Sequence, residues 1–234
     1  MRSANTSIRS NRVALLGAVL AVASVSSGAH DDGSSDKWLP ADSLVKEWWQ
    51  LYVSIPNSVR ELLNERRAAC GLGQRGDIWF LATAGTPDVT TTRRCTVPDG
   101  AKLLVPIVTA VCSPFPGETL EDNIQICREL IDPFNKLSLT IDGKSRNYLI
   151  ERRAHSRGFA AWYPEDNIWD TPAEDIPGGI YITVAEGQYA LVGGLSPGNH
   201  TIRARAASTT DSTVPKFDAI FEVTVTPAKT IVPK

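Results

Sequence analysis

The sequence predicts a mainly β fold of the α+β type: an immunoglobulin-like or related β-sandwich with two N-terminal helices and one inserted helix. Short segments that alternate apolar and polar residues, separated by turn residues, recur through the second half of the chain. Helical spacing of apolar residues is confined to two short regions near the N-terminus and one further region in the middle. Short strands at regular intervals are typical of a sandwich.

The first helix begins after Pro40, where apolar residues follow the spacing of one helix face. They are Leu44, Trp48, Leu51, Tyr52 and Ile55. Pro56 is expected to end the helix, because proline donates no N–H and clashes with the preceding turn. Trp48 and Trp49 are adjacent and cannot share one face. We therefore expect Trp48 to pack in the core and Trp49 to lie at a boundary or contact a ligand.

Two further helices are predicted. The second spans residues 58–70, where Ser58 and Glu61 have the spacing of a capping box. The third spans residues 119–131, where apolar residues again follow helical spacing and Thr119 is placed to cap the first turn.

Strands are predicted where apolar residues run together or alternate with polar ones. These segments are 78–81, 89–97, 103–111, 137–141, 148–150, 180–184, 189–192, 201–205 and 217–225. Pro106 indicates a bulge or an edge position. Asp142-Gly143 and Glu186-Gly187 are expected to form turns between strands. Residues 152–179 have no clear periodicity and are predicted to form a long loop.

Residues 1–29 have the three-part layout of a secretory signal peptide. Three arginines precede an apolar run over residues 13–25, and small residues end the segment at Ala29. The run of 13 residues is shorter than the about 20 needed to cross a bilayer. We expect a secreted or periplasmic protein with no membrane span after cleavage. Residues 30–40 are predicted to be a flexible lead-in, and residues 41–234 a single disulfide-stapled β-sandwich domain with a helical N-terminal part.

The charge balance argues against one class of partner. Lys and Arg number 24 and Asp and Glu 26, a formal net charge of −2. A nearly neutral chain lacks the basic surface of nucleic-acid-binding proteins, so no nucleic-acid partner is expected. Removal of residues 1–29 would leave 205 residues with a formal charge of −5, enough chain for one hydrophobic core.

The four cysteines are predicted to form structural disulfides. They are Cys70, Cys95, Cys112 and Cys127. Exported chains meet an oxidising environment, and an even number of cysteines fits complete pairing. Three pairings are possible, and we favour the sequential one, Cys70–Cys95 with Cys112–Cys127. No C-x-x-C spacing is present, so neither a zinc ribbon nor a thioredoxin-type redox site is supported.

Two stretches of sequence carry resemblances. Residues 195–202 followed by 217–227 resemble the last two strands of bacterial immunoglobulin-like domains, which implies a fold and no activity. A wider pattern consists of Trp48-Trp49-Gln50 with Ser54-Ile55-Pro56, Cys70 with Gly73-Gln74 and Trp79-Phe80-Leu81, and Arg94-Cys95-Thr96-Val97-Pro98 with Gly100, Pro106 and Cys112. This pattern is similar to an uncharacterised family of exported bacterial proteins, and it implies no activity.

Two segments match the consensus of catalytic or cofactor-binding motifs, but their surroundings in the sequence do not fit those motifs. Residues 71–76 match G-x-G-x-x-G, but a dinucleotide site needs a strand before the motif and a helix after it, and the order here is reversed. Residues 194–198 match G-x-S-x-G, but Pro197 follows the serine and has no N–H for an oxyanion hole. Both segments are expected to be turns.

His30 would become the N-terminal residue if cleavage follows Ala29. Its amine and ring nitrogen, with His155 or His200 as a further ligand, resemble the copper brace of lytic polysaccharide monooxygenases. The flexible segment that contains His30 argues against the rigid set of ligands that such chemistry needs. We therefore commit to no metal site and expect no cofactor, and His30 is kept as a candidate metal ligand.

The segment 162–175 is the candidate ligand-binding loop, because it concentrates aromatic and acidic residues. Its candidate residues are Trp162, Glu165, Asp166, Trp169, Asp170, Glu174 and Asp175. The aromatic rings could stack on sugars, and the carboxylates could bind hydroxyl groups or calcium. A pair of carboxylates held about 5–10 Å apart could also cleave a glycoside. A solvated acidic loop over two packed tryptophans is the alternative.

We predict an exported, disulfide-stabilised, non-catalytic binding domain whose partner is an extracellular or envelope ligand, with carbohydrate as one class of candidate. One alternative is a carbohydrate-active enzyme that uses the carboxylates of residues 162–175 or copper at His30. Another is a structural envelope protein. Asn199 begins an N-glycosylation sequon that matters only in a eukaryotic host.

Overall fold

The structure is a computed structural model, and it describes residues 41–59, 70–71, 74, 76–82, 87–113, 118–151, 153–167 and 177–227. The helices are α1 (Ala41–Tyr52), α3 (Leu120–Ile131) and the 3-10 turn η2 (Asn147–Leu149). The strands are β1 (Ile78–Phe80), β2 (Thr90–Pro98), β3 (Lys102–Cys112), β4 (Lys136–Ile141), β5 (Lys144–Ser145), β6 (Ala154–His155), β7 (Phe159–Tyr163), β8 (Gly179–Val192), β9 (Gly198–Ala207) and β10 (Phe217–Thr226).

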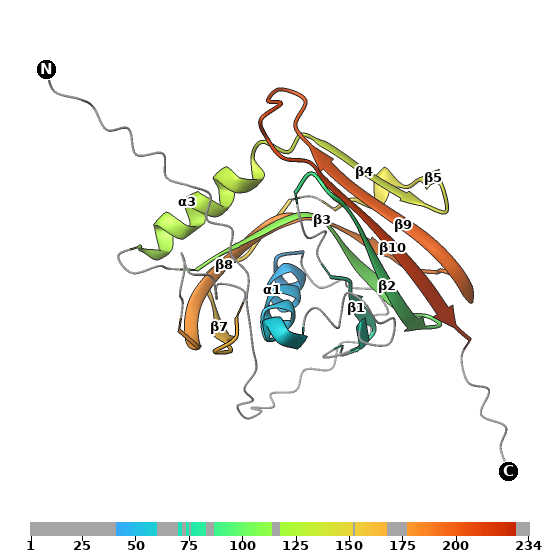
Figure 1. Ribbon diagram of the computed structural model, residues 1–234, viewed down its shortest axis with the longest axis horizontal. Coiled ribbons are helices and arrows are strands. Elements are labelled where there is room, and N and C mark those ends of the chain that lie inside the picture. Colours follow the sequence, from blue (N-terminus) through green and yellow to red (C-terminus); the bar gives the residue numbers. More distant parts are fainter. Residues whose placement is uncertain are drawn as a thin grey trace, which may run out of the picture.

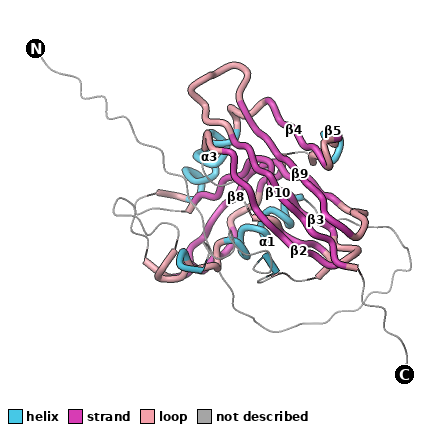
Figure 2. The backbone as a smooth tube through the Cα atoms, turned by 45° about the vertical axis from the view of Figure 1, so that its right-hand side comes forward, coloured by secondary structure: helices cyan, strands magenta, loops and turns pink. Residues whose placement is uncertain are grey.

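The strands form two mixed sheets that pack as a sandwich, which confirms the predicted mainly β fold. Sheet A has the order β1-β3-β8-β6, and β7 also pairs with β8. Sheet B has the order β2-β10-β9-β4-β5. Each sheet contains one parallel pair, β1 with β3 and β2 with β10, and is otherwise antiparallel. Figure 2 shows the long strands of sheet B running side by side.

Sheet A is the middle layer of the molecule. Sheet B and α3 cover one of its faces, and α1 covers the other (Figure 1). Strands that are buried on both faces carry nearly continuous apolar runs instead of an alternating pattern. That explains β3, where only Lys102 and Thr109 are not buried.

The core divides into two clusters on the two faces of sheet A. The larger cluster joins sheet A to sheet B and α3, with Leu103, Ile202 and Phe221 among its fully buried members. The smaller cluster joins sheet A to α1 and contains both Trp48 and Trp49. Sheet A therefore contributes residues to both hydrophobic clusters.

Trp49 corrects one prediction, because it is buried like Trp48 and lies at no boundary. The two indole rings meet edge to face, with centroids 4.6 Å apart. The Nε1 of Trp48 donates to the carbonyl of Leu81, and the Nε1 of Trp49 donates to the hydroxyl of Thr109. Helix α1 packs against residues of β3, β7 and β8, so the side chains at two adjacent positions are both buried.

The glycine of the predicted turn at Glu186-Gly187 lies instead inside an unbroken strand. Strand β8 runs through it for 14 residues. A Cβ at Gly187 would lie 2.6 Å from the carbonyl oxygen of Val108 and 2.8 Å from the Cα of Thr109. Glycine is needed here because β3 approaches closely where its register shifts between Pro106 and Val108. This shift is the bulge that Pro106 predicted.

The return strand expected at residues 148–150 does not form. Strand β5 ends at Ser145, and the chain turns through η2, which leaves Tyr148 exposed. The Oδ1 of Asn147 accepts the N–H of Leu139 at 2.9 Å and so takes the place of a strand partner beside β4. Ile150 then forms a bridge to Ala190 in the other sheet.

The long loop predicted at residues 152–179 contains two strands, β6 and β7, that pair with β8. Phe159, Ala161 and Tyr163 are buried, whereas Ala160 and Trp162 between them are exposed. Five residues are too few for this alternation to stand out in the sequence.

Helix α3 forms as predicted, and Thr119 and Asp122 make the reciprocal bonds of a capping box. Residues 57–59 are helical, one residue earlier than the predicted start of the second helix. The rest of that prediction, including Glu61, lies outside the described residues.

Both sequential disulfides are present. Cys70–Cys95 ties the segment before β1 to β2, with Cα atoms 5.4 Å apart. Cys112–Cys127 ties the end of β3 to α3, with Cα atoms 5.8 Å apart. Each bond closes a short loop, and the chain-entropy model assigns such a loop about 3 kcal/mol of stabilisation.

Candidate binding surface

Four exposed apolar side chains gather where β7 pairs with the beginning of β8. They are Leu120 (42% exposed), Trp162 (42%), Ile180 (68%) and Ile182 (48%). In the part of the chain that the structure describes, six large apolar side chains are exposed, and only Val89 and Tyr148 lie elsewhere. Single exposed apolar residues are ordinary, but a contiguous group indicates an interaction site. We call these four residues the apolar patch.

The pairing of β7 with β8 puts three members of the patch on one face. Trp162 lies opposite Ile180, and Ala160 lies opposite Ile182. Alternate residues of a strand point to opposite faces, so Phe159, Ala161 and Tyr163 point the other way, into the cluster formed with α1. This two-stranded ribbon is therefore apolar on both faces.

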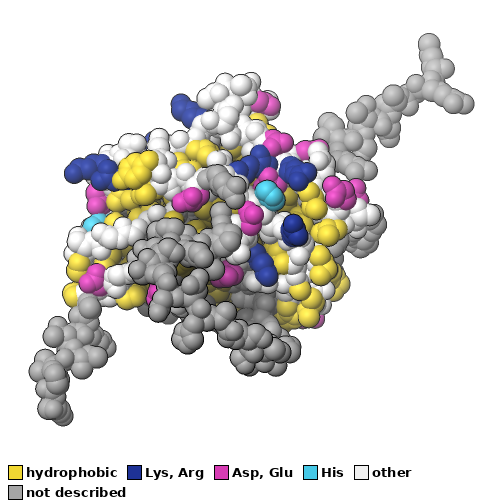
Figure 3. All heavy atoms as spheres, turned by 180° about the vertical axis from the view of Figure 1, so that it is seen from behind, with side chains coloured by type: hydrophobic (Ala, Val, Ile, Leu, Met, Phe, Trp, Pro, Cys, Tyr) yellow, Lys and Arg dark blue, Asp and Glu magenta, His cyan; other side chains and the backbone are white. Residues whose placement is uncertain are grey.

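Helix α3 contributes the fourth member of the patch. A Cβ at Gly158 would lie 3.1 Å from the side chains of both Leu120 and Ile182, so both side chains lie beside Gly158. The patch therefore extends from the sheet to the first residue of α3. Figure 3 shows the molecule from behind, with hydrophobic side chains gathered along the side on which β7 and β8 lie.

The ribbon that carries the patch is held firmly to the rest of sheet A. Beneath it, the hydroxyl groups of Ser113, Tyr163 and Thr183 bond to one another and are buried. At its outer edge, the Nε2 of Gln50 on α1 donates to the carbonyl of Ala160 at 3.1 Å. The apolar side chains are thus presented on a braced surface.

The acidic residues predicted beside Trp162 have other roles or lie outside the described residues. Asp166 accepts the N–H of Ser58 with its carboxylate and the N–H of Asn57 with its carbonyl, both at 2.9 Å. It therefore holds the start of the helical segment 57–59. Glu165 lies in the turn after β7, beside Gly178. Trp169, Asp170, Glu174 and Asp175 lie outside the described residues.

The histidines proposed for a copper site are distributed over two sheets. His30 lies outside the described residues, His155 lies on β6 of sheet A, and His200 lies on β9 of sheet B. Across the described ranges, no group of three or more His, Cys, Asp or Glu side chains is arranged to hold a metal ion.

His200 has a structural role in sheet B. Its Nδ1 lies 2.8 Å from the carboxylate of Asp142, and its Nε2 lies 2.8 Å from the carbonyl of Ser196. Both partners only accept hydrogen bonds, so the doubly protonated ring fits this site best. The hydrogen bond to Asp142 raises the pKa of His200 and lowers the pKa of Asp142.

Leu120, Ile180 and Ile182 are functional candidates that the sequence analysis missed, and the two isoleucines show why. The alternation Ile180, Ile182, Val184 predicts a strand with one face in the core, and only Val184 is buried. The three residues share a face, but the cover that α3 and sheet B provide at Val184 does not reach Ile180. A period of two is the same for a buried and an exposed apolar face, so no signal in the sequence distinguishes them.

Comparisons with known proteins add little to this geometry. No family model matches the chain, and no curated protein is similar to it. Among solved structures, the solution structure of amebosin has a TM-score of 0.20 and 12% sequence identity, over 64% of this chain and 99% of that chain. A TM-score this low supports neither a fold nor a function. None of the described helices is both long enough and apolar enough to cross a bilayer.

Proposed function

We propose that this chain is an exported, disulfide-stabilised, non-catalytic binding domain, and that it binds another protein through the apolar patch. The observation that carries the proposal is the contiguous exposure of Trp162, Ile180 and Ile182 on the ribbon of β7 and β8, beside Leu120 of α3. The two disulfides support a domain that folds in an oxidising compartment. The signal-like segment at residues 1–29 supports export.

The composition of the patch favours an apolar segment of a partner protein. Trp162 lies opposite Ile180 and shares its face with Ile182, and these aliphatic side chains cannot hydrogen-bond a sugar hydroxyl. Asp166, a carboxylate from the same part of the chain, already bonds the backbone of Ser58. Aromatic and aliphatic anchors that become fully desolvated are typical of the centre of protein interfaces.

Burial of the patch can account for measurable affinity. Full burial of an isoleucine or a leucine contributes about 1.5–3 kcal/mol. Because Ile180 is 68% and Ile182 48% exposed, their burial together would contribute on the order of 2–3 kcal/mol. Each 1.4 kcal/mol corresponds to about a tenfold change in affinity.

A photo-reactive amino acid in place of Ile182 tests the proposal in the native host. The matched control carries the same group in place of Tyr148, which is 77% exposed and lies outside the patch. We expect one protein to cross-link through position 182 and not through position 148. The partner, once identified and purified, should bind the wild-type domain directly.

Substitutions then measure the contribution of the patch to that affinity. Ile180→Lys should weaken binding about 10–100-fold, because a lysine resists burial in an apolar interface. Tyr148→Lys should leave the affinity unchanged. Equal cross-linking at both positions, or unchanged affinity in the Ile180→Lys variant, would contradict the proposal.

A carbohydrate ligand remains the second candidate, because the ring of Trp162 is partly exposed and could stack on a sugar. A glycan array would decide between the two. Binding that is lost in the Trp162→Ala variant and retained in the Ile180→Lys variant would favour the sugar.

We further propose that the chain belongs to the family of exported bacterial proteins that its sequence pattern resembles, and that its sandwich is immunoglobulin-like. The antiparallel pairing of β9 with β10 and the parallel pairing of β10 with β2 support the second part. N-terminal sequencing of the protein from the host envelope tests export: a first residue of His30 is expected, and an intact leader would contradict it.

A further inference from the structure

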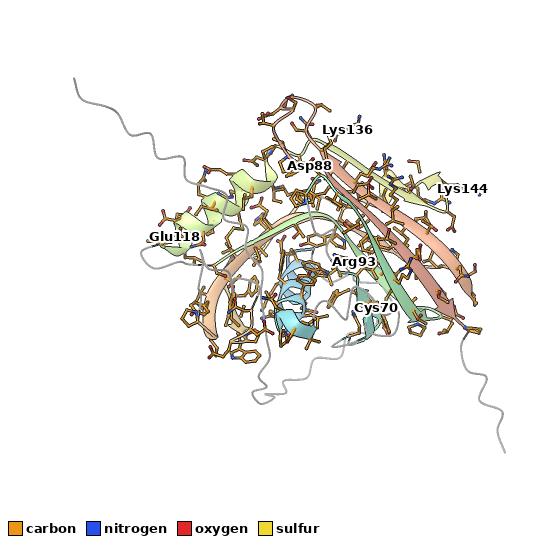
Figure 4. All side chains as sticks on the ribbon, viewed as in Figure 1. Cys70, Asp88, Arg93, Glu118, Lys136 and Lys144 are labelled. Carbon is orange, nitrogen blue, oxygen red and sulfur yellow. A yellow bond between two sulfur atoms is a disulfide. The ribbon has the colours of Figure 1, made fainter. Side chains whose placement is uncertain are left out.

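Arg93 lies on the inner side of edge strand β2. In this strand Arg93, Cys95 and Val97 are more buried than Thr92 and Arg94, as the alternation of a sheet requires. Figure 4 shows Arg93 on the side of β2 that faces α1. An arginine therefore occupies a position where this strand otherwise carries core residues.

The guanidinium of Arg93 has no anionic partner among the described residues. Its Nε is buried and makes no hydrogen bond. Four other arginines, Arg94, Arg153, Arg203 and Arg205, each contact a carboxylate. Burial lowers the pKa of the Arg93 guanidinium, and the nearby Tyr52 acts in the opposite direction.

The backbone of Arg93 is fixed by its neighbours. Arg93 is in register with Phe221 of β10, a buried core residue. Two residues further along, Cys95 is bonded to Cys70. The strand cannot rotate to bring Arg93 to the surface without breaking these contacts.

A partly buried guanidinium without a counter-charge is unfavourable, because desolvation is not offset by hydrogen bonds or by an opposite charge. We propose that Arg93, beside Tyr52 at the end of α1, is a binding site for an oxyanion, with a carboxylate or phosphate group as the part recognised. The planar fork of arginine bonds two oxygens of such a group at once. This site uses other residues than the apolar patch and goes beyond the proposed function.

Thermal unfolding of the purified protein in matched salts tests the site. Wild type, Arg93→Gln and Arg94→Gln are compared in sodium chloride, sodium phosphate and sodium acetate of equal ionic strength. Arg94 is the matched control, because it is the adjacent residue, points outward and already pairs with Glu222 at 2.7 Å. Phosphate stabilises most proteins through exclusion from their surface, so only differences between the variants count.

Site-specific binding at about tenfold excess over the dissociation constant should raise the Tm of wild type and Arg94→Gln by about 3–5 °C. The Arg93→Gln variant should lack this additional rise. In chloride, Arg93→Gln should unfold at a temperature at least as high as wild type, since it removes a partly buried charge that has no carboxylate partner among the described residues. A response to phosphate alone, to acetate alone or to both identifies the group that the site accepts.

Two results would overturn the assignment. One is an equal response of all three proteins to each anion. The other is that wild-type protein does not broaden the 31P line of inorganic phosphate and that acetate does not raise its Tm. The 31P measurement uses wild type and Arg94→Gln alone, so it decides for phosphate even where Arg93→Gln fails to fold.

Discussion

At the scale of single residues, the polar side chains of this protein mainly brace loops against strands. His200 joins the turn after β4, through Asp142, to the turn before β9, through Ser196. Arg153, just before β6, reaches Asp132 at the end of α3 and lies 2.5 Å from the buried Glu186 of β8. These contacts fix the ends of elements whose apolar faces form the core.

The pairing of His200 with Asp142 predicts a pH dependence of stability. Because the folded-state pKa of His200 is raised, its contribution is complete below about pH 6.5, the unfolded-state pKa, and is lost as the pH rises through the folded-state value. The contribution of Asp142, whose pKa is lowered, is present above about pH 3.9 and is lost as the pH falls through the folded-state value.

Urea unfolding between pH 6 and pH 8 measures the contribution of His200. The wild-type free energy of unfolding should fall across this interval by up to about 1 kcal/mol more than that of His200→Gln, a small difference because solvent screens the pair. Parallel curves for the two proteins would show that the ring is not bound in its charged form.

Sequence reasoning succeeds for residues whose role is local and fails where the role depends on distant neighbours. Thr119 could be identified as a cap, because its partner Asp122 is three residues away. Asp166 looks like a ligand-binding carboxylate in the sequence, and its actual partner, Ser58, is 108 residues away. Nothing in the sequence indicates that Arg93 points inward, because that depends on which of the two alternating sets of β2 residues faces the core.

At the scale of elements, β8 determines the architecture. Its second half pairs with β3 in the middle of the molecule, and its first half pairs with β7 in the ribbon that carries the apolar patch. The sequence predicts two strands here because Glu186-Gly187 has the composition of a turn. A glycine required by a close approach and a glycine required by a turn cannot be distinguished from the sequence alone.

Gly187→Ala tests this reading of β8. The added Cβ would lie 2.6 Å from the carbonyl oxygen of Val108, a backbone atom, so we expect a loss of about 2–3 kcal/mol in the free energy of unfolding. Gly193→Ala is the matched control on the same segment, because the nearest atom to its Cβ would be the Cγ of Lys102 at 3.7 Å.

The control should change stability by less than about 1 kcal/mol. Denaturant unfolding of both variants provides the comparison. Equal stability of Gly187→Ala and Gly193→Ala would mean that β3 and β8 are further apart than the structure shows.

At the scale of the whole molecule, the two sheets, α1 and α3 of the described residues share one continuous body with sheet A at its centre. The class of fold could be predicted from the sequence, because most strands alternate cleanly and the inserted helix is well capped. The layer order could not, since it depends on which face of sheet A each helix covers. The apolar patch follows from that order: three of its members, Trp162, Ile180 and Ile182, lie on strands of sheet A at the edge of the cover that α3 and sheet B provide.

The central claim is that this body folds outside the cytoplasm, with its two disulfides closed. Intact mass analysis of protein from the native host, alkylated before purification, tests the claim most directly. The account predicts a chain that begins at His30, carries no alkyl group and is four hydrogens lighter than its reduced form. Four alkylated cysteines on a chain that retains residues 1–29 would contradict it.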